Sequence, residues 1–92
     1  MTPPHTNIED VLCSKTRLKM LKVLMQSELL TISEIARRTA VNYVSARTHL
    51  ETLENGNILT HLMFGKRTRY YKFKDSPIAN AVKDFVETYS NP

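Results

Sequence analysis

Two short helical segments joined by a tight turn, with two strand-forming runs directly after them, restrict the possible folds of this chain more than any other feature. The first segment covers about residues 33–40. Ser33 is its expected N-cap, and Glu34 is well placed against the positive end of the helix. Val41 and Asn42 then make the turn. This order predicts a helix-turn-helix unit followed by a β-hairpin.

The second segment covers about residues 43–54, with Asn42 as its cap. We expect Asn55 and Gly56 to end it, because both tolerate the left-handed conformation that lets a chain reverse. Small or apolar side chains predict the surfaces buried where the two helices cross, and these are Ile35, Ala36, Ala46, Leu50 and Leu53. The opposite side of the second helix should face solvent, and it carries Tyr43, Val44, Ser45, Arg47, Thr48 and Glu51.

The two strand-forming runs, residues 58–64 and 69–73, are rich in β-branched, aromatic and aliphatic side chains. Between them Gly65 allows a sharp turn. Residues 58–74 contain no acidic residue and five basic ones, namely Lys66, Arg67, Arg69, Lys72 and Lys74. Strand alternation places Tyr71 and Phe73 on one face, which we expect to pack on the helices. The pattern predicts a hairpin with a basic tip, residues 64–70.

Further helices are predicted on both sides of this unit. Thr6 and Glu9 have capping-box spacing at the start of a short helix whose apolar face consists of Ile8, Val11 and Leu12. Ser14 caps a helix that reaches about residue 27 and has a polar side formed by Lys15, Lys19, Lys22 and Gln26. Ser76 and Pro77 begin the last helix, whose apolar stripe is Ile78, Ala81, Val82, Phe85, Val86 and Tyr89. Since 92 residues bury only a modest core, we expect the first and last stripes to form a homodimer interface.

The predicted order is helix, helix, a short extended piece at residues 30–32, helix, helix, strand, strand, helix. This is a mainly α fold with a small β-hairpin (α+β). Residues 1–92 are expected to form a single domain, because no repeat or linker interrupts them. No run approaches the roughly 20 apolar residues of a membrane span, and the N-terminus lacks a secretory signal, so we expect a cytoplasmic protein.

Cys13 is the single cysteine, and it has no Cys or His neighbour at metal-ligand spacing. The first interpretation is a buried small apolar residue. A disulfide across a dimer axis is the alternative.

A basic hairpin beside an exposed helix face is the electrostatic pattern of a nucleic-acid contact. Arg47 can bind guanine with two hydrogen bonds, and Val44 can pack against a thymine methyl group. The cations of the tip suit phosphates or an adjacent minor groove. We therefore predict sequence-specific binding of double-stranded DNA, with residues 43–54 in the major groove. The predicted contacts are Ser33, Asn42, Tyr43, Val44, Ser45, Arg47, Thr48, Lys66, Arg67, Thr68 and Arg69.

Three segments together resemble one family of regulators. SKTRLKMLKVL at residues 14–24 is similar to the second-helix pattern of ArsR-type winged-helix regulators. TISEIARRTAVNYVSARTHLETLENGNIL at residues 31–59 is similar to the helix-turn-helix of that family, and FGKRTRYYKF at residues 64–73 is similar to its wing. The resemblance implies a homodimer held by the first and last helices, which presents two recognition helices to successive major grooves.

The chain departs from the metal-responsive members of that family, which carry paired cysteines in the first helix of the motif or His and Asp clusters on the last helix. Residues 33–40 hold no thiol, the last helix has Asp84 and Glu87 but no histidine, and His5, His49 and His61 are widely spread. We therefore predict no metal site and no other cofactor. The sequence gives no indication of a small-molecule effector.

Other functions stay open at this point. A winged helix can act as a non-specific architectural DNA-binding protein or as a protein-interaction module. The sequence argues against an enzyme, because Gly56 and Gly65 form no phosphate-binding loop and no nucleophile and base stand at a recognisable spacing.

Overall fold

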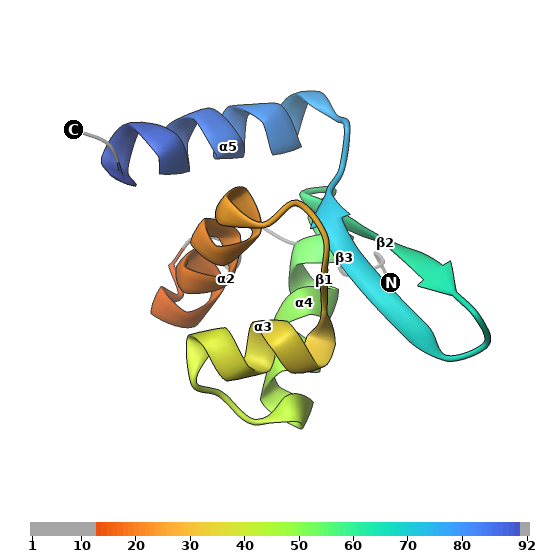
Figure 1. The fold of residues 1–92 in the computed structure, drawn as a ribbon. Coiled ribbons are helices and arrows are strands. Elements are labelled where there is room, and N and C mark those ends of the chain that lie inside the picture. Colours follow the sequence, from red (N-terminus) through yellow and green to blue (C-terminus); the bar gives the residue numbers. More distant parts are fainter. Residues whose placement is uncertain (1–12, 91–92) are drawn as a thin grey trace, which may run out of the picture.

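The computed structural model describes residues 13–90, and the side chains of residues 13–88. Its helices are α2 (Lys15–Gln26), α3 (Ile32–Thr39), α4 (Tyr43–Asn55) and α5 (Pro77–Ser90), and its strands are β1 (Leu30–Thr31), β2 (Leu59–Phe64) and β3 (Thr68–Phe73). Within this part of the chain the elements follow the predicted order, so the mainly α (α+β) class is confirmed (Figure 1). The predicted helix with Ile8, Val11 and Leu12, and the side chain of Tyr89, lie outside the described residues.

Helix α3 begins with a reciprocal cap between Thr31 and Glu34. The Glu34 N–H donates to Thr31 Oγ1 at 3.2 Å, and the Thr31 N–H donates to Glu34 Oε1 at 3.0 Å. The Thr31 hydroxyl donates to the same Glu34 Oε1 at 3.1 Å, and the two bonds donated by Thr31, first that of its N–H and then that of its hydroxyl, lower the pKa of the Glu34 carboxyl. The prediction that Ser33 is the N-cap is therefore wrong: Ser33 is the second helical residue, because the helix starts directly where strand β1 ends.

Helices α3 and α4 both end in a left-handed residue followed by a hydrogen bond that closes the last turn. After α3 this residue is Ala40, with φ of 59°, and the Val41 N–H donates to Ala36 O at 3.1 Å. After α4 it is Asn57, with φ of 63°, whereas Gly56 has φ of −84°. Helix α4 thus ends at Asn55 with Gly56 as its C-cap, as predicted, but the expectation that one of these two residues is left-handed is wrong, because the turn closes between Ile58 N–H and Leu53 O and places Asn57 in that conformation.

The three strands form an antiparallel sheet in the order β1-β3-β2. Strand β1 pairs only with Tyr70 and Tyr71, while β2 pairs with β3 along its whole length. The hairpin turns through Gly65, which has φ of 69° as its predicted role requires. The β2–β3 hairpin consequently projects away from the helices (Figure 1).

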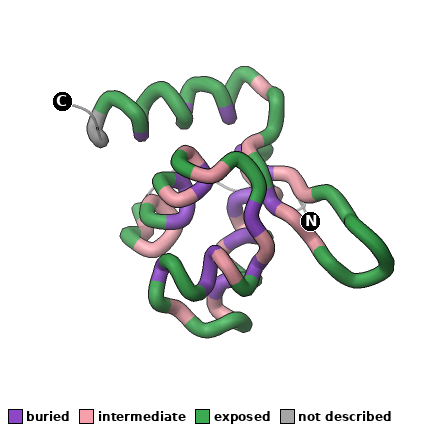
Figure 2. The backbone as a smooth tube through the Cα atoms, in the orientation of Figure 1, coloured by how far each residue is buried: buried purple, intermediate pink, exposed green. Residues whose placement is uncertain are grey.

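The core lies where α2, α3, α4 and the base of the hairpin meet (Figure 2). The predicted crossing residues are all buried, which confirms that set: Ile35, Ala36, Ala46, Leu50 and Leu53. Tyr71 is fully buried and Phe73 packs against the same cluster, as the strand alternation predicted.

Cys13 is exposed, so the prediction that it is buried is wrong. The residue lies just before α2, outside the helix whose apolar face reaches the core.

Helix α5 starts as predicted, with the Ala79 N–H donating to Ser76 Oγ at 3.1 Å. Its apolar stripe divides into two parts. Val82 and Val86, together with Ala79, are buried, and the two valines pack in the core of the same chain. Ile78, Ala81 and Phe85 are exposed on the neighbouring flank. None of the helices within residues 13–90 is both long and apolar enough to cross a membrane.

A polar contact ties α2 to α4 through Arg17 and His49. Arg17 Nη1 lies 2.9 Å from His49 Nδ1, and since a guanidinium only donates, the imidazole nitrogen accepts and carries no proton. Burial, followed by the charge of Arg17, lowers the pKa of His49. The packing of α2 on α4 therefore favours a neutral imidazole.

Replacing His49 by glutamine should reduce the pH dependence of stability between about pH 7.5 and 5.5. The folded chain has the pKa of His49 below 6.5, whereas the unfolded chain takes up this proton at its ordinary value. The free energy of unfolding of the wild type should therefore fall as the pH drops below about 6.5. Urea unfolding at a series of pH values measures this, and an equal fall in His49→Gln would contradict it.

Replacing Thr31 by alanine should cost about 0.5–2 kcal/mol of folding free energy, because one N–H of α3 loses its side-chain acceptor. Ser33→Ala is the matched control, and its effect should stay within about 0.5 kcal/mol, as for ordinary surface changes. Chemical denaturation of both variants measures the difference. A larger loss from Ser33→Ala than from Thr31→Ala would restore Ser33 as the cap.

Candidate nucleic-acid interface

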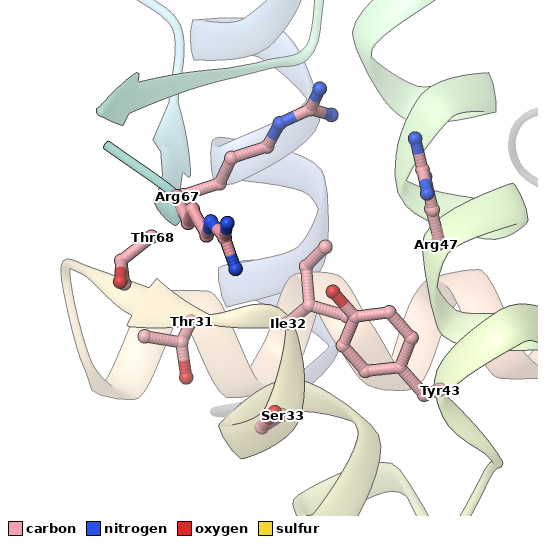
Figure 3. Close-up of a pocket in the computed structure, with 8 residues that line it drawn as sticks. Thr31, Ile32, Ser33, Tyr43, Arg47, Arg67 and Thr68 are labelled. Carbon is pink, nitrogen blue, oxygen red and sulfur yellow. The ribbon is translucent and has the colours of Figure 1, made fainter. Parts of the chain in front are cut away.

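A cleft of about 390 Å³ opens between the hairpin and the N-terminal ends of α3 and α4. Its lining comes from three separate parts of the chain and consists of Thr31, Ile32, Ser33, Tyr43, Arg47, Arg67, Thr68 and Arg69. We call it the arginine cleft. In Figure 3, Arg67 and Thr68 stand on the hairpin side, Tyr43 and Arg47 on the α4 side, and Thr31 and Ser33 at the start of α3.

The shortness of β1 creates this cleft. Strand β1 pairs with Tyr70 and Tyr71 and then turns into α3 at Ile32, so the next residues of β3, Thr68 and Arg69, have no strand beside them on that side. The first turn of α3 lies there instead. Helix α4 also begins at the cleft, where Asn42 Oδ1 accepts the Ser45 N–H at 2.8 Å, which confirms the predicted cap. Two helix N-termini, each with a partial positive charge, therefore border the same space.

The lining suits an anion with several oxygen atoms. Three guanidinium groups belong to it, from Arg47, Arg67 and Arg69, and no acidic side chain does. Hydroxyl groups of Ser33 and Tyr43 add hydrogen-bond donors. Cationic forks and helix N-termini are the groups that bind phosphate in proteins.

Arg69 is placed by its contacts at the root of the basic tip. The neighbouring Tyr71 hydroxyl, and more weakly the carboxylates of Glu54 and Glu51, raise the pKa of Arg69. Tyr71 Oη itself is buried and has no hydrogen-bond partner of good geometry among the described residues, and burial raises the pKa of this hydroxyl. Arg69 is thus a permanent cation next to a buried polar group.

A second polar contact holds the hairpin against α4. His61 Nδ1 of β2 lies 2.6 Å from Glu54 Oε2 near the end of α4. The His61 ring also lies against Tyr71, with centroids 5.5 Å apart. These contacts join the base of the hairpin to the C-terminal part of α4.

The exposed side of α4 forms a second surface beside the cleft. Val44 is 73% exposed, and Arg47, Thr48 and Glu51 are exposed with it, as predicted. Arg47 Nε lies 3.3 Å from Glu51 Oε1, in a pair that is about half exposed at both ends (54% and 55%). The Thr48 hydroxyl donates to Val44 O at 3.1 Å and keeps its lone pairs.

The predicted DNA-binding residues divide between these surfaces. Ser33, Tyr43, Arg47, Arg67, Thr68 and Arg69 line the arginine cleft. Val44 and Thr48 lie on the exposed side of α4, and Lys66 is exposed in the hairpin loop. Asn42 serves as the cap, and Ser45 is half-buried, so the expectation that Ser45 is exposed is wrong; it lies on the flank next to the buried Ala46. Thr31 also lines the cleft but is not among the predicted residues, although its spacing to Glu34 is that of a capping box.

Within the part of the chain that the structure describes, no three His, Cys, Asp or Glu side chains gather as a metal site would require.

Comparison with known proteins begins with the sequence. The sequence model of the family described as bacterial regulatory protein, arsR family, matches residues 14–61. A search of curated proteins finds no match.

Solved structures share the fold. A fragment of a possible transcriptional regulatory protein from Mycobacterium bovis has a TM-score of 0.71 and 22% identity, covering 89% of this chain and 85% of that one. A homodimeric winged helix-turn-helix DNA-binding domain from the same organism, solved in solution, has a TM-score of 0.72 and 23% identity, covering 88% and 72%. Reduced HlyU from Vibrio cholerae has a TM-score of 0.74 and 17% identity, covering 89% and 83%. The fold of this chain is therefore a winged helix-turn-helix.

Proposed function

Because this chain belongs to the ArsR family of bacterial regulatory proteins, we propose that it regulates transcription in the cytoplasm by binding specific sites on double-stranded DNA. The observation that carries the proposal is the arginine cleft, which lies directly beside the exposed side of α4. One surface suits phosphates and the other suits base edges, and a DNA reader needs both. The proposal includes no catalytic step and no cofactor.

The exposed side of α4 would lie in the major groove, as the second helix of such a motif does. Glu51 occupies the Nε side of the Arg47 guanidinium, so the terminal nitrogens remain available for the O6 and N7 atoms of a guanine. Val44 presents an apolar surface for a thymine methyl group, and the Thr48 hydroxyl can accept from a base amino group.

The arginine cleft would hold a backbone phosphate next to that groove. Arg67 and Arg69 approach from the hairpin, while Ser33 and Tyr43 approach from the starts of α3 and α4. Such contacts fix the register of α4 on the duplex and supply affinity that depends on salt. Asn42 would contribute indirectly, because it caps the helix that carries the base contacts.

Replacing Arg47 by alanine should cost about 1–3 kcal/mol on the preferred site and much less on random duplex, because only the preferred site offers the guanine. Lys22→Ala is the matched control, since it removes one exposed cation from α2 and should leave both affinities nearly unchanged. Fluorescence anisotropy with labelled duplexes at one fixed salt concentration measures both.

Equal losses on the two duplexes would reduce Arg47 to a phosphate contact. In the wild type, a regulator should prefer its own site by about a thousandfold or more. If the wild type binds both duplexes equally well, it is the non-specific architectural protein. If it binds neither duplex, the protein-interaction module is the remaining alternative.

We further infer that the chain acts as a homodimer, with the exposed flank of α5 at the interface. This flank consists of Ile78, Ala81 and Phe85. Val82 and Val86 hold the helix that carries this flank in place, because they pack α5 on the core of the same chain. Ile8, Val11, Leu12 and Tyr89 complete the proposed interface. The homodimeric state of the Mycobacterium bovis domain supports the dimeric state of this chain.

Replacing Ala81 by glutamate should convert the dimer to a monomer, because it places a charge in the middle of the apolar flank. Asn80→Glu is the matched control, since residue 80 is exposed on the polar side of the same helix. Sedimentation velocity should give twice the 10.6 kDa chain mass for the wild type and Asn80→Glu, and the single mass for Ala81→Glu. A wild type that sediments as a monomer at micromolar concentration would refute the dimer.

A further inference from the structure

The far end of the β2–β3 hairpin exposes large apolar side chains that the core does not use. Leu62 is 42% exposed, and Met63 and Phe64 are each 50% exposed. They end strand β2, which among residues 13–90 is an edge strand that pairs with β3 on one side. A hairpin that only gripped phosphates would need cations at its end, not half-exposed Met and Phe side chains.

The strand register places two of these residues next to the arginine cleft. Met63 is paired with Arg69 and Phe64 with Thr68, and both partners line the cleft. Leu62 lies one step nearer the base of the hairpin, opposite Tyr70. The apolar end of β2 therefore adjoins the arginine cleft.

Phe64 is held in a defined position. Its ring meets the Tyr70 ring edge-on, with centroids 4.9 Å apart and an interplanar angle of 78°. Gly65 follows immediately with φ of 69°, so the chain reverses directly after Phe64 and leaves this side chain at the outer end of the strand. A supported aromatic ring loses little conformational freedom when it binds.

The charges around these side chains indicate what they would meet. Lys66 and Arg67 follow Phe64 in the loop, Arg69 lies opposite Met63, and residues 59–73 contain no acidic side chain. An apolar contact enclosed by cations fits a base-pair step with a phosphate on either side. Pairing with a second hairpin of the same kind would bring like charges together.

We propose that Phe64, held by its ring contact with Tyr70, enters the minor groove as a wedge that partly unstacks one base-pair step and kinks the duplex. This inference rests on the proposed DNA binding and adds a second, shape-dependent element to its specificity. Flexible pyrimidine–purine steps open most easily, so the protein should prefer such a step under the hairpin. Lys66 and Arg67 would hold the phosphates on its two sides.

Base unstacking at successive positions tests the wedge. The probe is a duplex enriched by the wild-type protein from a random pool, with 2-aminopurine replacing one adenine at a time in the sequence outside the major-groove contacts. The wild type should raise the fluorescence roughly twofold or more at one step and bend the duplex by about 20° or more, measured by energy transfer between its ends.

Three variants complete the test. Phe64→Ala should lose the fluorescence rise and most of the bend, with affinity falling by about tenfold or less. Phe64→Trp should keep the rise, because a flat ring remains at the same place. Leu62→Ala, which removes an exposed apolar side chain from the same strand, should behave as the wild type does. Thermal unfolding of each variant verifies that it is folded.

The wedge is refuted if Phe64→Ala keeps the rise, if Leu62→Ala abolishes it, or if the bound wild type raises the fluorescence at no position. A wild type that binds no duplex at all is a different result, since it refutes the DNA-binding function together with the wedge.

Discussion

The reciprocal hydrogen bonds between Thr31 and Glu34 join the sheet to helix α3, and the candidate site depends on that junction. Thr31 ends β1, where it pairs with Tyr70, and in the same place it caps α3. Because the chain passes from strand to helix without a loop, the first turn of α3 lies beside β3 at the place where β1 would otherwise continue. The arginine cleft is the space that this replacement leaves.

Helical periodicity predicted which sides of the helices are buried. In α4, Ala46, Leu50 and Leu53 form the apolar side of the helix, and this side is the one that packs into the core. Periodicity did not locate the cap of α3, because Thr31 and Ser33 both suit an N-cap and the capping-box spacing of Thr31 to Glu34, which favours Thr31, was overlooked. It also treated the α5 stripe as one surface, although Val82 faces the core of its own chain and Ile78 does not. The cleft itself joins residues 31–33 to residues 67–69, which are more than thirty positions away, and spacing along a chain does not give distances between such segments.

The buried side of α4 and the side proposed to contact DNA are opposite each other, so each can change with little effect on the other. The inner side contributes the core, while the outer side carries Arg47 and Glu51 in an exposed ion pair. Such a pair contributes about 0–1 kcal/mol to stability, and exchanging part of it for a base contact costs the fold little. The hairpin is divided in the same way. Tyr71 at its base belongs to the core, whereas Phe64 and the cations at its end lie outside the core.

The proposed function requires that the exposed side of α4 reads bases while the hairpin grips the flanking strand. Duplexes from a random pool that the purified protein retains at about 0.15 M salt can be enriched and sequenced to show whether it does. A homodimer that reads bases in this way should enrich one shared inverted repeat whose half-sites lie one helical turn, about 34 Å, apart. Retained duplexes without any common sequence, or no retained duplex even at low salt, would contradict it.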